Sequence, residues 1–134
     1  MIEHTTTLRV RYADTDNMGI VYYAKYFEYF EVARTEMLRA CGLPYVAIEE
    51  SGFQLPVVEA KASYFSGAKY DEMLSIRATM PREPSPRLVI HYEIRTGEAN
   101  TLIANGETTL VFVNKLTGKP ARPPKAYIDA INNF

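Results

Sequence analysis

Residues 11–44 read RYADTDNMGIVYYAKYFEYFEVARTEMLRACGLP, and they hold the one long helix that the sequence predicts. Apolar residues in this stretch recur at helical spacing, and those on the common face are Tyr26, Phe30, Ala33, Met37 and Cys41, with Phe27, Tyr29, Leu38 and Ala40 beside them. Gly42 suits the left-handed residue that follows a helix, and Pro44 blocks its continuation. The pattern therefore predicts a helix over residues 23–41.

Two aspartates, Asp14 and Asp16, lie in an acidic loop just before this helix. A helix N-terminus exposes unpaired backbone N–H groups and a partial positive charge, which attract an anion or a carbonyl oxygen on which charge develops. A carboxylate beside these groups could act as a nucleophile or as a general base. Because aspartate is also a common N-cap residue, spacing alone favours a capping role for one of the two.

The rest of the chain is predicted to be mainly strands. Alternating apolar and polar residues predict strands over 6–12, 74–80, 88–95 and 101–114, an extended segment over 53–65 with Pro56 at its entry, and short helices over 44–50 and 124–132. Asn105 and Gly106 would also suit a hairpin turn, but the arm before them would be very short, so Gly106 is interpreted as a bulge or a close approach. One long helix with antiparallel strands predicts a single α+β domain over residues 1–134.

Composition and charge exclude several classes of protein. The 134 residues are 47% hydrophobic and 23% charged, which is ordinary for a globular domain, and the net charge of −1 gives no case for binding nucleic acid. The single cysteine, Cys41, excludes an internal disulfide and an all-cysteine zinc site. No apolar run is long enough to span a membrane, and no signal peptide is recognisable, so a cytoplasmic setting is expected.

The loop and the helix together resemble a known family signature. The run YADTDNMGIVYY over residues 12–23, followed by Tyr26, EVAR over 31–34 and CGLP over 41–44, is similar to the 4-hydroxybenzoyl-CoA thioesterase family and to its Tol-Pal-associated branch. Weaker similarity covers nearly the whole chain. The resemblance implies a hotdog fold, an antiparallel five-stranded sheet wrapped around one long central helix. It also implies homodimers, commonly assembled into homotetramers, with active sites at the dimer interface.

The same resemblance implies an activity and a role for particular residues. The reaction would be hydrolysis of an acyl-CoA thioester, without a metal and without a cofactor other than the coenzyme A of the substrate. Asp16 would be the nucleophile or the general base, the backbone N–H of Tyr23 would polarise the thioester oxygen, and Gly19 would allow a turn or a close approach. The Tol-Pal branch usually has histidine where this chain has Tyr23, so the identity of the acyl group stays open.

Charged residues outside the loop each have a structural and a functional interpretation. Arg34 projects inside the apolar arc of the helix and Glu31 lies on its boundary, so an ion pair is expected. That pair would orient the helix or the dimer, which is the favoured interpretation, or would brace Asp16 or form part of a pocket wall. The basic residues that could bind the phosphates of coenzyme A, or could simply be solvated loop residues, are Arg82, Arg87, Lys119, Arg122 and Lys125.

Two other functions stay open from the sequence. A hotdog dehydratase or hydratase would use a histidine with a carboxylate, but His4 and His91 both lie outside the loop before the helix, which disfavours this function. Neither histidine belongs to a metal-ligand motif. A non-catalytic scaffold would bind acyl-CoA or an acyl carrier protein without turnover, and Asp16 would then be only a cap.

Overall fold

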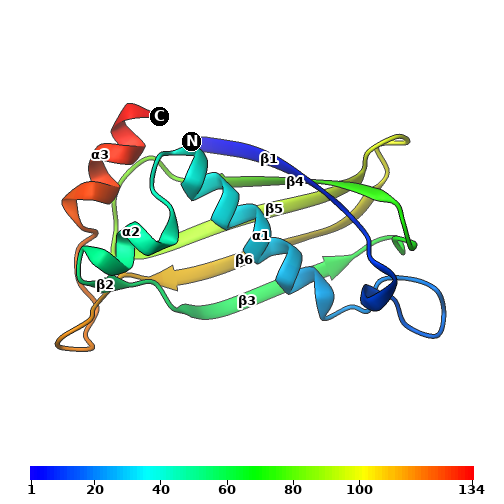
Figure 1. Ribbon diagram of the computed structural model, residues 1–134, viewed down its shortest axis with the longest axis horizontal. Coiled ribbons are helices and arrows are strands. Elements are labelled where there is room, and N and C mark those ends of the chain that lie inside the picture. Colours follow the sequence, from blue (N-terminus) through cyan, green and yellow to red (C-terminus); the bar gives the residue numbers. More distant parts are fainter.

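The computed structural model describes residues 1–134. One antiparallel sheet curves around a single long helix (Figure 1). The five strands follow the spatial order β1 (Ile2–Arg9), β4 (Met73–Met80), β5 (Arg87–Thr96), β6 (Leu102–Val111) and β3 (Val57–Tyr64). The short strands β2 (Phe53–Gln54) and β7 (Val113–Asn114) pair with each other, and the helices are α1 (Lys25–Ala40), α2 (Tyr45–Glu50) and α3 (Lys125–Asn133). The predicted α+β architecture is confirmed.

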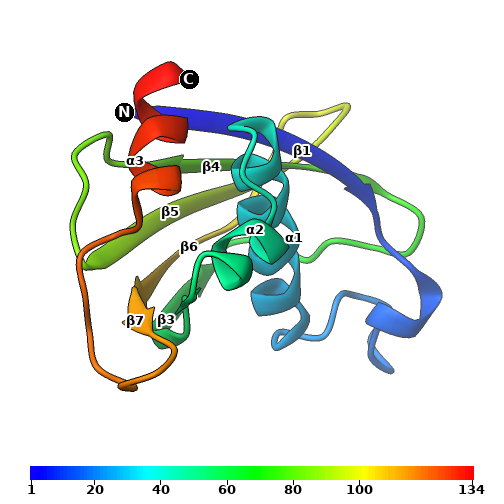
Figure 2. The same cartoon turned by 60° about the vertical axis from the view of Figure 1, so that its left-hand side comes forward.

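Helix α1 lies against the concave face of the sheet (Figures 1 and 2). Its buried side chains are Tyr26, Tyr29, Phe30, Ala33, Met37 and Leu38, which agrees with the predicted apolar face. The helix begins two residues later than predicted, because residues 22–24 form a turn. It ends at Ala40, and Gly42 then has φ of +81°, the left-handed conformation expected after a helix. Cys41 is half-buried and packs against the core, whereas Ala40, which was predicted to lie beside the apolar face, is exposed.

Gly106 allows the closest approach between the helix and the sheet. The ring of Phe30 stacks on Tyr92 of β5 with centroids 4.4 Å apart and an interplanar angle of 13°. A Cβ atom on Gly106 would lie 2.4 Å from Cε2 of Phe30 and 2.6 Å from the carbonyl oxygen of Lys61. The predicted close approach is therefore confirmed. The alternative of a bulge at this residue is wrong, because Gly106 pairs in regular register with Tyr92 and Ala62.

Several strand boundaries differ from those predicted. Strand β1 covers residues 2–9 rather than 6–12, because it pairs with β4 along its whole length and the chain then turns into a short 3-10 helix at Tyr12–Asp14. The extended segment 53–65 divides at Pro56, and the second part, β3, is an edge strand. The last predicted strand is interrupted at Phe112, whose backbone N–H donates to the carbonyl oxygen of Pro86 at 2.8 Å.

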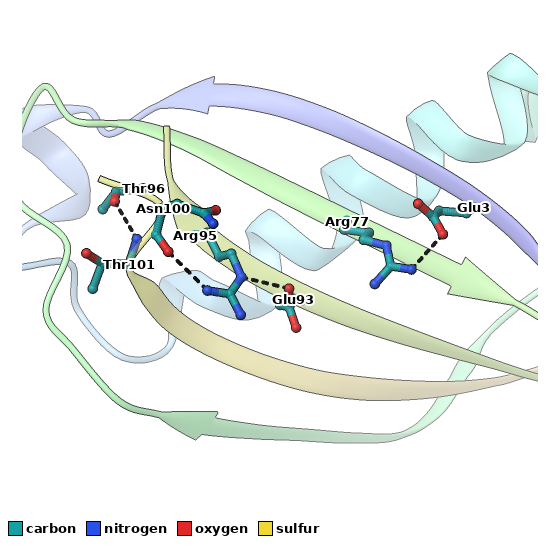
Figure 3. Close-up of polar contacts among 7 residues, drawn as sticks. All are labelled: Glu3, Arg77, Glu93, Arg95, Thr96, Asn100 and Thr101. Carbon is teal, nitrogen blue, oxygen red and sulfur yellow. Dashed lines mark hydrogen bonds and ion pairs between the residues drawn. The ribbon is translucent and has the colours of Figure 1, made fainter. Parts of the chain in front are cut away.

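The outer face of the sheet is polar. Arg77 on β4 donates to Glu3 on β1 at 2.6 Å, and Nε of Arg95 donates to Glu93 at 2.8 Å (Figure 3). A hollow of about 400 Å³ on this face is also lined by His91, an exposed residue on β5. The convex face is thus a solvated, charged surface, on the opposite side of the sheet from α1. No helix is both long and apolar enough to cross a membrane.

Candidate active site

The acidic loop folds into a small hairpin that holds Asp16 at its base. Thr15 and Val21 form an isolated antiparallel bridge, and the N–H of Asp16 donates to the carbonyl oxygen of Ile20 at 2.9 Å. The N–H of Gly19 donates a hydrogen bond of 3.0 Å to the carbonyl oxygen of Asp16, and Gly19 has φ of +79°. A Cβ on Gly19 would meet nothing within 4 Å, so glycine serves the turn here and not a close approach.

The Asp16 side chain is half-exposed and turns back on its own loop. Its Oδ1 atom accepts a hydrogen bond from the backbone N–H of Met18 at 2.8 Å, which is the local bonding pattern of an aspartate that opens a turn. This bond occupies one of the two carboxylate oxygens, and Oδ2 has no protein partner. Asp16 therefore keeps one carboxylate oxygen that no protein group occupies.

Neither aspartate caps α1, so the capping role that the spacing favoured is wrong. The N-cap residue is Ala24, in helical conformation, and no side chain bonds to it. Asp14 is instead buried, and its Oδ2 atom accepts hydrogen bonds from the Tyr29 hydroxyl at 2.8 Å and from the N–H of Arg11 at 3.2 Å. Asp14 therefore ties the loop to the inner face of α1, and Asp16 is left without a structural role in the helix.

The start of α1 offers unpaired donors beside this loop. The carbonyl oxygens of Asp14 and Tyr22 accept bonds from the N–H groups of Tyr22 and Lys25, each at 2.8 Å, which fixes the turn before the helix. The N–H groups of Tyr23 and Ala24 donate to no backbone or side-chain acceptor. Unpaired N–H groups at a helix start attract negative charge. The Tyr23 side chain itself is 60% exposed.

Several tyrosine rings contact one another at the start of α1, and Tyr64 contacts both Tyr23 and Tyr26. The Tyr64 hydroxyl donates to the carbonyl oxygen of Tyr23 at 3.2 Å, and its ring centroid lies 5.4 Å from that of Tyr26. Burial against these rings raises the pKa of Tyr64 above its ordinary value. A cavity of about 350 Å³ beside them is also lined by Ile20 and Phe65. Sequence reasoning missed Tyr64, although its place in the alternation of β3 was visible.

The predicted ion pair on α1 is present but is weakly formed. A terminal nitrogen of Arg34 lies 3.9 Å from Oε2 of Glu31, and the Arg34 side chain is 15% exposed against 70% for Glu31. The charge of Arg34 also acts on buried Tyr92. Burial raises the Tyr92 pKa, and the positive charge of Arg34 opposes that rise. The Tyr92 hydroxyl shares a hydrogen bond of 2.6 Å with Thr108. Neither Glu31 nor Arg34 contacts Asp16, so no contact within one chain supports the prediction that this pair braces Asp16.

The five basic candidates gather at the opposite end of the molecule from Asp16. Arg87 opens β5 opposite Val111, while the Asp16 loop lies near the end of β3, where Tyr64 pairs with Ala104 of β6. Arg82 donates to the carbonyl oxygen of Ile131 at 2.7 Å, which gives it a structural role at the end of α3. The other candidates lie on or just before α3, namely Lys119, Arg122 and Lys125 (Figure 1). One chain alone does not bring these charges to Asp16.

The histidines also lie away from the loop. His4 is on β1, where it pairs with Ala78 and contacts Thr6, and His91 is on the polar outer face. No group of three or more histidine, cysteine, aspartate or glutamate side chains is arranged to hold a metal ion.

The fold and this loop define a class of protein. A family model described as the thioesterase-like superfamily matches residues 10–131, so the chain belongs to that superfamily. The family and the hotdog fold that the sequence predicted are thereby confirmed.

Individual relatives share most of their length with this chain. It is 35% identical over 121 residues to the acyl-CoA thioester hydrolase YbgC of Escherichia coli O6:H1, covering 90% of each chain. It is 33% identical to the putative acyl-CoA thioesterase YneP of Bacillus subtilis, covering 91% of this chain and 88% of that protein. Among solved structures, Slr0204, a 1,4-dihydroxy-2-naphthoyl-CoA thioesterase from Synechocystis, superposes with a TM-score of 0.90 at 28% identity, covering 98% of this chain and 97% of that one.

Proposed function

We propose that the protein hydrolyses acyl-CoA thioesters at the joint between the Asp16 loop and α1. The observation that carries this proposal is that the loop holding Asp16, a carboxylate that caps no helix, bonds to Tyr22, directly before the unpaired N–H groups of Tyr23 and Ala24. A thioester needs both elements, an oxygen nucleophile or base and a donor for the carbonyl oxygen that becomes negative. The family of the chain supports the same reaction class.

The reaction balances with water as the second substrate. Asp16 either attacks the thioester carbon and forms an anhydride that water then hydrolyses, or removes a proton from the water that attacks directly. In both routes the carbonyl oxygen gains negative charge, and the Tyr23 N–H stabilises it. The carbon–sulfur bond breaks with its electron pair on sulfur, the coenzyme A thiolate takes up a proton, and the acyl group leaves as a carboxylate.

The working unit in this proposal is a pair of chains joined through β3. This edge strand is exposed along nearly its whole length, and it carries the exposed side chains of Val57 and Val58. Exposed edges need pairing or protection. Antiparallel self-pairing centred on Ala60 would place Glu59 of each copy opposite Lys61 of the other, whereas centring on either charged residue would oppose like charges. Assembly of such pairs into tetramers stays a prediction.

This pairing accounts for the distant basic residues. Two antiparallel copies of β3 place the Asp16 end of one chain beside the opposite end of the other, the end that holds β2, β7 and the start of β5. Arg87, Lys119, Arg122 and Lys125 would then approach the loop from the second copy, where they can bind the phosphates of coenzyme A. Arg82 contributes less in this proposal, because its guanidinium already bonds to the end of α3.

The test compares wild type with Asp16→Asn on a panel of aliphatic and aromatic acyl-CoA thioesters, with free-thiol release as the readout. Asparagine can accept the same hydrogen bond from Met18, so the melting temperature should stay within about 2 °C, while kcat falls on the order of a hundredfold or more. Equal turnover by both proteins would remove Asp16 from the mechanism. Absence of turnover in both, with acyl-CoA or acyl carrier protein still bound, would establish the scaffold instead.

A further inference from the structure

We infer that Asp14 is a positioning residue, which holds the Tyr23 N–H in place relative to Asp16 and thereby controls kcat of the proposed reaction. Asp14 is the one buried carboxylate of the chain, with 6% of its surface exposed, and no step of that reaction uses it. The inference rests on the proposed thioesterase function and adds to it a residue that acts on the reaction without touching the substrate.

The backbone of Asp14 closes the loop that carries Asp16. Its carbonyl oxygen accepts the N–H of Tyr22 at 2.8 Å, so residues 15–21 leave and return at one point. Asp16 follows Asp14 by two positions, and Tyr23 directly follows Tyr22. A shift of Asp14 would therefore change the distance between the carboxylate and the N–H group. Because both must meet one thioester group, a misplacement of about 1 Å can lower the rate on the order of a hundredfold.

The side chain of Asp14 fixes this closing point to the helix. Its Oδ2 atom accepts both the Tyr29 hydroxyl, at 2.8 Å, and the N–H of Arg11, at 3.2 Å. Tyr29 lies beyond the first turn of α1, so the bond ties the loop to the regular part of the helix. Movement of Asp14 would leave a buried carboxylate without its donors, which is costly. Asp14 is therefore held firmly where the two ends of the loop meet.

Tyrosine rings extend from the Asp14 bond to the other side of the turn before α1. Tyr29 meets Tyr26 edge to face, with centroids 5.8 Å apart and planes at 90°. The Tyr26 ring lies 5.4 Å from that of Tyr64, whose hydroxyl donates to the Tyr23 carbonyl oxygen at 3.2 Å. The turn is thus held from one side by Asp14 and from the other by Tyr64, which fixes the direction of its unpaired N–H groups.

The first experiment compares kcat and KM of wild type, Asp14→Ala and Asp14→Asn on an acyl-CoA, well below the melting temperature of each protein. Alanine removes the acceptor, so kcat should fall about thirtyfold or more while KM stays within about threefold. Asparagine can place its oxygen at the position of Oδ2 and accept both bonds, so its kcat should return to within about fivefold of wild type. Wild-type kcat in a folded alanine variant, or an asparagine variant no faster than alanine, would overturn the inference.

Tyr29→Phe and Tyr92→Phe separate positioning from stability. Each removes the hydroxyl of a buried tyrosine that makes one short hydrogen bond, to Asp14 at 2.8 Å in the first and to Thr108 at 2.6 Å in the second. The two variants should melt at similar temperatures, but only Tyr29→Phe should lower kcat, by about two- to tenfold. An equal kcat in the two folded variants would make the Asp14 bond merely structural and would overturn the inference.

Amide hydrogen exchange, followed by NMR, reports on the loop closure without any substrate. The Tyr22 N–H is protected by its bond to the Asp14 carbonyl oxygen. In Tyr29→Phe this amide should exchange about tenfold faster than in wild type, whereas in Tyr92→Phe its rate should stay within about twofold. Equal exchange rates of the Tyr22 amide in the two variants would contradict the positioning role.

Wild-type turnover separates this inference from the proposed function. If wild type releases coenzyme A and the Asp14→Ala and Tyr29→Phe variants release it equally fast, the positioning role is wrong and the thioesterase function stands. If wild type releases none from any aliphatic or aromatic acyl-CoA, the thioesterase function is wrong, and the positioning role with it.

Discussion

The hydroxyl of Tyr29 donates a hydrogen bond of 2.8 Å to the buried carboxylate of Asp14, and this bond joins the acidic loop to the inner face of α1. The charge on Asp14 in turn helps to hold the Tyr29 pKa well above its ordinary value, together with the larger effect of burial. The bond therefore fixes the loop on which Asp16 stands.

Tyr29→Phe should destabilise the fold. It removes a donor from a buried carboxylate, which then keeps only the N–H of Arg11, so the free energy of unfolding should fall by about 1–3 kcal/mol. Urea denaturation measures this change. Tyr12→Phe is the control, because Tyr12 is 77% exposed and its hydroxyl bonds to nothing, and it should change stability by less than about 0.5 kcal/mol. Equal stability of the two variants would contradict the anchoring role.

Gly106→Ala should lower the stability of the fold more than the addition of one methyl group would suggest. The new Cβ would lie within 2.6 Å of the Lys61 carbonyl oxygen and of the Phe30 ring, so the stack of Phe30 on Tyr92 must shift. Overpacking of this kind costs about 1–3 kcal/mol or more. Gly97→Ala is the matched control, because its Cβ would be 3.4 Å from the nearest atom. Thermal melts of both variants decide the question, and similar melting temperatures would refute the packing argument.

Gly106 and Asp16 show which features of the fold and the site could be predicted from the sequence and which could not. Periodicity predicted α1 and its buried face, because a helix packed on a sheet repeats its apolar residues every turn. It could not decide between a bulge and a close approach at Gly106, since that depends on Phe30, which is far away in the sequence. The capping role predicted for an aspartate was wrong for a similar reason: the turn at residues 22–24 and the partner Tyr29 are set by tertiary contacts.

Tyr64→Phe should lower kcat more than it changes KM. The Tyr64 hydroxyl bonds to the Tyr23 carbonyl oxygen at 3.2 Å and steadies the turn that presents the unpaired N–H groups. Loss of one such bond corresponds to about 0.5–1.5 kcal/mol, or roughly a two- to tenfold fall in kcat. Tyr23→Phe should stay near wild type, because the proposed donor at that position is the backbone N–H. Steady-state kinetics on one acyl-CoA distinguish the two, and a reversed order of effects would remove Tyr64 from the positioning role.

Lys61→Glu should weaken the proposed dimer. In the register centred on Ala60 the substitution opposes two negative charges at both symmetric positions, so the dimer dissociation constant should rise on the order of tenfold at low salt. Adding Glu59→Lys to the same chain restores opposite charges and should restore the dimer. Sedimentation velocity across a concentration series measures both variants. A double variant that dissociates as readily as the single one would exclude this register.

Alkaline pH should destabilise the protein through its buried tyrosines. Burial raises the pKa of Tyr127 to about 12, so the folded state keeps its phenol proton at a pH where the unfolded chain, with an ordinary pKa near 10, has lost it. The stability that Tyr127 contributes is therefore complete below about pH 10 and is lost as pH rises through 12. Within that window the free energy of unfolding should fall by about 1.4 kcal/mol per pH unit for each such tyrosine.

Tyr127→Phe separates this residue from the other buried tyrosines. The variant keeps the ring that packs on Phe112 with centroids 4.8 Å apart, but it has no proton to lose. Its free energy of unfolding should fall less steeply between pH 10 and 12 than that of wild type, by the equivalent of one proton. Urea midpoints at closely spaced pH values measure the slope. Identical slopes would mean that Tyr127 ionises in the folded state as readily as in the unfolded chain, and that its burial does not raise its pKa.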